Sequence, residues 1–143
     1  GDPGWAGALA TLLRSTPWVG PALEAAEMVL PIPLAPQRLR MRGFNQALLL
    51  AQALAPARVQ AGLLLRTHDT TAQSGLDRAR RLRNLARAFA VEPLRAAQLA
   101  GRQVLLVDDV MTTGATLQAA AAVLRQAGAA RVTALVLART PQD

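Results

Sequence analysis

Apolar residues recur with two periods along the chain, and each period predicts a different kind of element. Short apolar runs bounded by polar residues, proline or glycine predict strands at 27–33, 59–65, 88–91, 101–107 and 131–138. Stretches rich in Leu and Ala at helical spacing predict helices at 5–14, 44–55 and 116–126, with Pro56 and Gly128 following the last two. Trp5 and Trp18 are expected to be core or N-terminal packing residues.

The order strand, helix, strand over 101–138 predicts one βαβ unit with parallel strands. Buried strands with intervening helices predict an α/β fold, a parallel sheet flanked by helices. The 143 residues are expected to form a single domain, with an N-terminal helical segment at 1–26. In such sheets ligands bind beyond the carboxyl ends of the strands, so the residues after 107 are the first place to look for a site.

Composition excludes several kinds of site. The chain has no Cys and a single His, His68, which excludes disulfides and thiolate zinc sites and argues against a Ser-His-Asp triad. No apolar run reaches about 18 residues, so we expect no membrane insertion. The absence of Cys agrees with a cytoplasmic location. Aromatic residues make up 3% of the chain, which disfavours a nucleic-acid site built from stacked rings.

The basic residues are all Arg, and the net charge is +7. Such a charge favours an anionic partner only where arginines cluster, because arginine forks match pairs of phosphate oxygens. In one cluster, Arg38, Arg40 and Arg42 occupy every second position of a segment expected to be extended, which would place the three side chains on one side. The other lies in 66–87, expected to be a flexible Arg-rich loop that enters a short helix. The candidates for phosphate or DNA contact are Arg38, Arg40, Arg42, Arg80 and Arg83; ordinary solvated arginines are the alternative.

The run VLLVDDVMTTGAT, residues 104–116, combines an apolar strand, two acidic residues and a short loop before a helix. Gly114 lets the main chain approach a ligand closely, and the start of the helix offers unpaired N–H groups to a phosphate. N-capping of the helix by Thr113 or Thr116 is the structural alternative. The candidate phosphate-binding residues are Thr112, Thr113, Gly114, Ala115 and Thr116.

Asp108 and Asp109 are expected at the end of the strand, beside the phosphate loop. Carboxylates accept hydrogen bonds from ribose hydroxyls, suit a hydrated Mg²⁺ ion and stabilise an oxocarbenium-like sugar carbon. The alternative is that Asp108 caps the next turn and that Asp109 is solvated. A phosphate loop next to paired carboxylates indicates a ribose 5-phosphate site.

The run 104–116 resembles the 5-phosphoribosyl 1-pyrophosphate (PRPP) binding motif of type I phosphoribosyltransferases, and it lacks the Gly-Lys-Ser/Thr of a P-loop. A narrower resemblance covers most of the chain. PIPLAPQRLRMRGFNQ (31–46), RTHDTTAQSGLDRARRLRN (66–84) and the PRPP motif are together similar to the competence protein F (ComF) family. The residues that carry it outside the PRPP motif are Arg42, Gly43, Phe44, Asn45, Gln46, Thr70, Gln73, Leu76, Arg81 and Asn84.

The resemblance implies a role for each part of the site. The 5-phosphate would bind the loop 112–116, and the catalytic pair Asp108 and Asp109 would meet the ribose hydroxyls. Mg²⁺ would arrive with PRPP and lie near this pair, without direct protein ligands. The residues expected beside the pyrophosphate are Pro31, Ile32, Pro33 and Arg81.

Three functions stay open. The first is a PRPP-binding ComF-like protein that supports DNA uptake in natural transformation, with PRPP, single-stranded DNA and other competence proteins as partners. The second is a phosphoribosyltransferase that moves ribose 5-phosphate to a nucleobase or amine and releases pyrophosphate. The third is a nucleic-acid-binding regulator that senses PRPP. The oligomeric state is left open, a homo-oligomer included. The Cys-rich zinc ribbon with which many ComF members begin either was lost or precedes this segment, so no role of it is carried over.

Overall fold

The strands form two separate sheets. The computed structural model describes residues 4–67, 77–111 and 114–139. Within them, β1, β4 and β5 form a parallel sheet in the order β1-β4-β5, and β2 and β3 form a small antiparallel one. The described strands are β1 (Met28–Pro31), β2 (Leu64–Arg66), β3 (Phe89–Val91), β4 (Gln103–Met111) and β5 (Arg131–Arg139).

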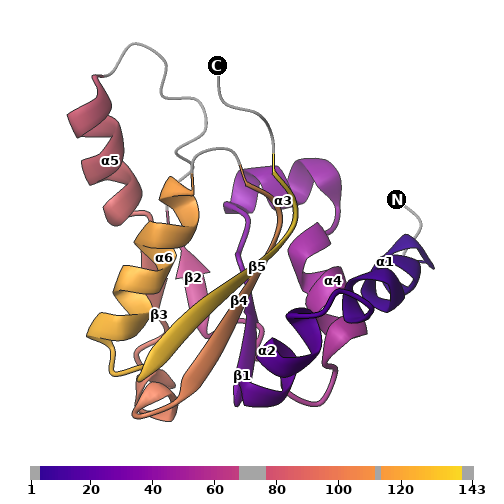
Figure 1. Ribbon diagram of the computed structural model, residues 1–143. Coiled ribbons are helices and arrows are strands. Elements are labelled where there is room, and N and C mark those ends of the chain that lie inside the picture. Colours follow the sequence, from indigo (N-terminus) through magenta and orange to yellow (C-terminus); the bar gives the residue numbers. More distant parts are fainter. Residues whose placement is uncertain (1–3, 68–76, 112–113, 140–143) are drawn as a thin grey trace.

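Helices cover both faces of the parallel sheet (Figure 1). α6 and the β2–β3 sheet lie on one side, and α1, α2 and α4 lie on the other. α3 and α5 lie toward the end where the parallel strands finish. The described helices are α1 (Gly4–Arg14), α2 (Val19–Ala25), α3 (Pro36–Arg42), α4 (Gln46–Leu54), α5 (Arg78–Ala86), the 3-10 helix η1 (Ala96–Leu99) and α6 (Ala115–Gln126).

β4 separates two hydrophobic cores, because alternate residues of a strand point to opposite faces of its sheet. Val104 and Leu106 belong to the core on the α6 side. Leu105 and Val107 belong to the core on the side of α1, α2 and α4. All four side chains are buried. The predicted α/β fold, a parallel sheet flanked by helices, is therefore confirmed.

β5 is less buried than the apolar run 131–138 suggested. Leu135 is buried, whereas Arg131, Thr133 and Ala134 are exposed. The reason is its place in the sheet: in the described part of the chain β5 is an edge strand whose one neighbour is β4. The sequence predicted the strand correctly but not its position at the edge.

The segment that carries Arg38, Arg40 and Arg42 is a helix, and the prediction of an extended segment was wrong. Pro36 fits the first turn of α3, where its missing N–H is not needed. Gly43 ends the helix in the left-handed conformation, φ 80°, and its N–H donates to the carbonyl of Leu39 at 2.7 Å. On a helix Arg38 and Arg42 share a face, while Arg40 points elsewhere.

The strand predicted at 59–65 divides into two parts. Val59 makes a single parallel bridge to Val29 of β1, flanked by hydrogen bonds from Val29 N–H to the carbonyl of Arg58 and from Gln60 N–H to the carbonyl of Val29. A turn then reverses the chain before β2, which pairs with β3. The other predicted strands and helices are present, with ends that differ by a few residues.

The two tryptophans are not both packing residues. Trp18 is 49% exposed, so its expected place in the packing is wrong. Trp5 is half-buried on α1 and lines a surface groove beside Asp109. Neither indole belongs to the two hydrophobic cores.

Candidate functional site

The sequence suggested that the two aspartates of the motif follow the end of the strand. In the structure they lie within β4. β4 continues to Met111, and its register with β5 pairs Asp108 with Val136 and Val110 with Ala138. The ladder therefore fixes the main chain of both aspartates. Both side chains are half-buried.

Strand alternation directs the two side chains to different faces of the sheet. Asp108 continues the series of Val104 and Leu106, on the α6 side. Asp109 continues the series of Leu105 and Val107, and it lines the groove on the α1 side. The sequence predicted a pair of neighbouring carboxylates but not this division between faces.

The two carboxyl groups nevertheless interact. Burial raises the pKa of Asp108 to about 7, and hydrogen bonding with the carboxyl of Asp109 and its negative charge contribute to the same rise. The N–H of Asp109, which donates to Oδ1 of Asp108 at 2.9 Å, and the positive charge of Arg66 act in the opposite direction. Asp108 can therefore gain or lose a proton near neutral pH.

Arg66 is a neighbour of Asp108 that sequence reasoning missed. It ends β2, on the α6 side of the parallel sheet, and its guanidinium lies 5.2 Å from the ring centroid of Phe89. Its positive charge lowers the pKa of Asp108 and so acts on the half-buried carboxyl. The one available signal was its position at the start of the segment 66–84.

The loop after β4 leads into α6 through Gly114. This glycine has φ 82°, a left-handed conformation that side chains disfavour, and it occupies the N-cap position without a side-chain cap. Ala115 and Thr116 begin the helix, so Thr116 does not cap it. The first turn of a helix presents main-chain N–H groups and the positive end of its dipole, an arrangement that suits an anion. Thr112 and Thr113 lie outside the described residues.

The segment after β1 is held beside β4. The N–H of Ile32 donates to the carbonyl of Val107 at 2.8 Å, which extends the pairing of the two strands. Asn45 Nδ2 donates to the carbonyl of Ile32 at 3.1 Å, while its Oδ1 accepts from the N–H of Ala47 at 2.9 Å. Pro31 and Ile32 are buried and Pro33 is half-buried. Asn45 thus caps α4 and fixes the segment predicted to lie beside pyrophosphate.

The two arginine clusters lie on separate helices. α3 and α5 contain no buried residue, and they lie on opposite sides of the parallel sheet near its carboxyl end (Figure 1). Asp77 caps α5 by accepting from the N–H of Arg80 at 2.8 Å. Arg80, Arg81 and Arg83 are exposed on α5. An ion pair between Arg102 and Glu27, at 2.8 Å, lies near the amino ends of the strands, away from both clusters.

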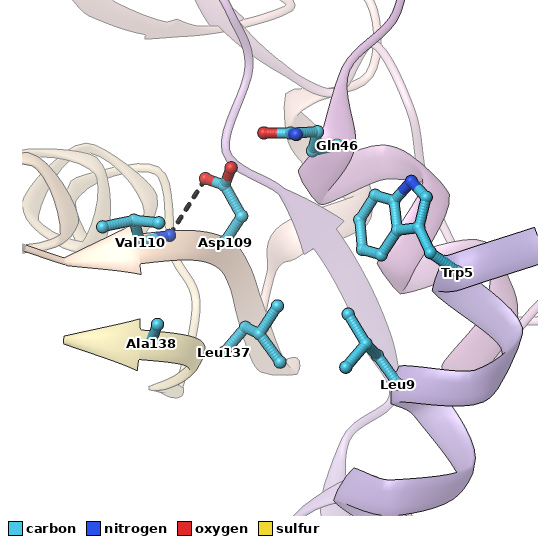
Figure 2. Close-up of a pocket in the computed structure, with 7 residues that line it drawn as sticks. All are labelled: Trp5, Leu9, Gln46, Asp109, Val110, Leu137 and Ala138. Atoms are coloured by element: carbon cyan, nitrogen blue, oxygen red, sulfur yellow. Dashed lines mark hydrogen bonds between the residues drawn. The ribbon is translucent and has the colours of Figure 1, made fainter. Parts of the chain in front are cut away.

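A groove of about 400 Å³ lies next to Asp109 (Figure 2). Trp5 and Leu9 of α1 form one wall, and Figure 2 shows the indole facing across it toward the ends of β4 and β5. The opposite wall includes Leu137, and Gln46 at the start of α4 supplies an amide. No pattern in the sequence linked Trp5 to the PRPP motif, because they meet only in the folded chain.

The acidic residues present suit Mg²⁺ that arrives with a ligand. Hard carboxylate oxygens match this ion, which commonly keeps several waters and uses substrate phosphates as ligands. In the part of the chain that the structure describes, no three His, Cys, Asp or Glu side chains gather to hold a metal. A Mg²⁺ ion would therefore be held chiefly by its phosphate ligand, with the two aspartates nearby and not as direct ligands. In the same described part, no helix has the length and apolarity to cross a membrane.

Comparison with known proteins identifies a family. The family model of the phosphoribosyl transferase domain matches residues 58–143, more than half of the chain. DNA utilization protein YhgH of Escherichia coli O6:H1 is 37% identical over 121 residues, covering 82% of this chain and 52% of the relative. Competence protein F of Haemophilus influenzae is 36% identical over 120 residues, with the same coverage.

More distant similarity extends to a further competence protein and to a solved structure. Competence protein ComFC of Streptococcus pneumoniae is 34% identical over 108 residues, covering 76% of this chain and 46% of the relative. The crystal structure of TT1426 from Thermus thermophilus shares 19% identity, covers 99% of this chain and 85% of that one, and has a TM-score of 0.46. The chain spans about half the length of the curated relatives it matches. The similarity to competence protein F confirms the resemblance seen in the sequence.

Proposed function

The chain belongs to the phosphoribosyl transferase domain family, and we propose that it binds PRPP at the carboxyl end of β4 in support of DNA uptake in the cytoplasm. The relatives named competence protein F and DNA utilization protein support the second part of the proposal. The first part is argued from the residues around β4.

The main observation that supports PRPP binding is that a carboxyl group and the start of a helix follow each other along one stretch of main chain. Asp108 offers a half-buried carboxyl, and Gly114, which has no side chain, occupies the N-cap position of α6. A sugar phosphate with free hydroxyls matches both, because hydroxyls donate to the carboxylate and phosphate accepts from helix N–H groups. Ile32, held by Asn45, bounds the same region from β1.

DNA contact is assigned to the arginines of α3 and α5. Both helices are exposed throughout or nearly so, and neither contains an acidic residue. A backbone of phosphates is the anion that suits dispersed guanidinium groups, and such contact needs no aromatic stacking. Arg38, Arg42, Arg80 and Arg83 are the residues that we expect to contribute.

A second candidate function, transfer of the ribose 5-phosphate to an acceptor, is favoured by the groove beside Asp109. An acceptor bound there would lie beside Asp109, which follows in the strand the Asp108 proposed to bind the sugar. In that reaction the acceptor nitrogen bonds to the anomeric carbon while the bond to pyrophosphate breaks. Positioning of the two substrates would supply much of the rate enhancement.

Calorimetric titration with PRPP, with and without Mg²⁺, tests the proposal. Wild-type protein should show saturable binding that Mg²⁺ strengthens, and Asp108→Asn should weaken it by about tenfold or more through loss of a charge-assisted hydrogen bond. Glu24→Gln, an exposed position on α2, is the charge-matched control and should bind as the wild type does. Absence of saturable binding by folded wild-type protein would overturn the proposal.

A further inference from the structure

Arg66 ends β2, and an aromatic ring of the neighbouring strand holds its side chain. The register of the small sheet places Arg66 directly across from Phe89 of β3. The guanidinium carbon lies 5.2 Å from the centroid of the Phe89 ring, which is a cation–π contact. Phe89 is buried in the core and Arg66 is half-buried. The cation is therefore confined before any ligand binds.

The packing of β2 on the parallel sheet brings Arg66 toward Asp108. Leu64 of β2 and Leu106 of β4 are buried in the same hydrophobic core, on the α6 side. Alternate residues of a strand share a face, so Arg66 follows Leu64 out of this core as Asp108 follows Leu106. α5 immediately precedes β3, so the antiparallel β2 ends on the side of α5, toward the carboxyl end of the parallel sheet (Figure 1). The cation and the carboxyl therefore leave the core at the same end.

Two charged side chains act on Asp108: Asp109 of the same strand and Arg66. The neighbouring elements add none close to it, because β1 has no titratable residue, β5 has none between its two ends, and α6 has none before its last turn. The arginines of α5 are exposed, so water and salt screen their charge. In the described part of the chain, Arg66 is therefore the cation that opposes both the burial of Asp108 and the charge of Asp109.

We propose that Arg66, held by Phe89, is a positioning residue that keeps Asp108 in its carboxylate form for the ribose hydroxyls of PRPP. A carboxylate only accepts hydrogen bonds, whereas one oxygen of a protonated carboxyl carries its own proton. Hydroxyls that donate are therefore bound best when Asp108 has lost its proton. The inference rests on the proposed function for its meaning, but Arg66 acts on Asp108 whether or not a ligand is present. The two proposals can therefore fail separately.

Titration of Asp108 in the ligand-free protein gives the first measurement. In protein with carbon-13-labelled aspartate, the carboxyl signal of Asp108 is assigned by its loss in Asp108→Asn and followed by NMR from pH 4 to 10. Arg66→Gln should raise the pKa of Asp108 by about 0.5 pH unit or more, because the opposing cation is gone. Arg66→Lys keeps the charge and should restore most of the wild-type pKa. Arg125→Gln removes the same charge in the last turn of α6 and should leave the pKa of Asp108 unchanged.

A variant of Phe89 separates the charge from the ring that holds it. Phe89→Leu removes the ring beneath the guanidinium but keeps an apolar side chain in the core, so Asp108 should titrate between wild type and Arg66→Gln. Phe44→Leu makes the same change between α3 and α4 and should leave the titration as in the wild type. A wild-type titration in folded Phe89→Leu would overturn the role of the ring. If Phe89→Leu does not fold, the Arg66 variants decide the inference alone.

The pH dependence of PRPP binding gives the second readout. By calorimetry at pH 7, Arg66→Gln should bind PRPP about twofold more weakly than wild type, which is the expected loss of ionised Asp108. At pH 9 Asp108 is ionised in both proteins, so the two affinities should agree. Weaker binding by the same factor at both pH values would indicate direct contact between Arg66 and the ligand and would overturn the positioning role.

The ligand-free titration separates this inference from the proposed function. If Asp108 titrates in folded Arg66→Gln as it does in the wild type, the inference is overturned, whether or not PRPP binds. If the titration shifts as expected while wild-type protein does not bind PRPP, the effect of Arg66 on Asp108 is supported and the proposed function fails instead.

Discussion

The side-chain amide of Asn45 joins the start of α4 to the segment after β1, by donating to the carbonyl of Ile32 at 3.1 Å. Its oxygen accepts from the N–H of Ala47 at the same time. One residue thus performs two tasks that a simple cap would not require. This dual contact gives the Asn of the RGFNQ run a structural reason for its presence.

Replacement of Asn45 should separate the two tasks. Asn45→Ala should lower the free energy of unfolding by about 2 kcal/mol, the sum of a lost cap and a lost hydrogen bond. Asn45→Ser retains a capping oxygen but does not reach Ile32, so it should lose about half as much. Urea denaturation measures both. If Asn45→Ser is as stable as the wild type, the contact with Ile32 contributes nothing to stability.

The raised pKa of Asp108 should make stability depend on pH. The pKa is about 7 in the folded protein, against an ordinary value of 3.8, so the folded state retains a proton that the unfolded state releases between these values. Stability contributed by this group is therefore lost as pH rises from about 4 to 7. Asp108→Asn should be more stable than wild type by about 2 kcal/mol at pH 8, after allowance for partial exposure, and near equal at pH 4.

Urea denaturation at pH 4.5, 6 and 8 checks this dependence. The difference between Asp108→Asn and wild type should grow with pH across the series. Asp109→Asn removes one cause of the raised pKa, so it should move the transition to lower pH. A difference that stays constant from pH 4.5 to 8 would contradict the shifted pKa.

Gly114 should not tolerate a side chain. At φ 82°, Gly114→Ala is expected to cost about 1 kcal/mol of unfolding free energy and to weaken phosphate binding by distorting the start of α6. Gly7→Ala is the matched control, because Gly7 lies inside α1 with open space where a Cβ would point, and it should be neutral or stabilising. Thermal unfolding and phosphate titration give the two readouts. Equal behaviour of both variants would argue against a conformational requirement at Gly114.

The exposed arginines should determine the salt dependence of DNA binding. If Arg80 and Arg83 each contact one phosphate of single-stranded DNA, the double change to Gln should reduce the slope of log K against log salt by about 1.4. Arg125→Gln/Arg131→Gln, at the end of α6 and the amino end of β5, removes the same charge far from α5 and should change the slope little. Fluorescence anisotropy with a labelled oligonucleotide at several salt concentrations measures the slopes. Equal slopes for wild type and both variants would show that Arg80 and Arg83 do not contact DNA phosphates.

Much of the fold could be predicted because, in most segments, the spacing of apolar residues agrees with the proline, glycine and polar residues that bound them. The run at 101–107 and the Leu- and Ala-rich stretches become β4, α4 and α6 with small changes at their ends. The exceptions arise where local sequence is ambiguous. A segment with Arg at every second position matched a strand, but Pro36 and Gly43 favour a short helix, and these two residues determine the outcome.

The site was predictable in part. The PRPP motif marked Asp108, Asp109 and the loop before α6, since their chemistry is local in sequence. The partners contributed by other segments were not predictable: Arg66 approaches Asp108 from β2, and Trp5 approaches Asp109 from α1. Contacts of this kind depend on how the elements pack, which no spacing along the chain records.

Because β4 lies between two cores, the face to which each of its aspartates points depends on how many strand residues precede it. Insertion or deletion of a single residue in β4 before Asp108 would exchange the faces of every later side chain. Asp109 would then point toward α6 and Asp108 into the groove, although the composition of the strand would hardly change. Odd-numbered and even-numbered positions of this strand therefore face different cores. A change in its length by two residues would keep each side chain on its face and would be less harmful than a change by one.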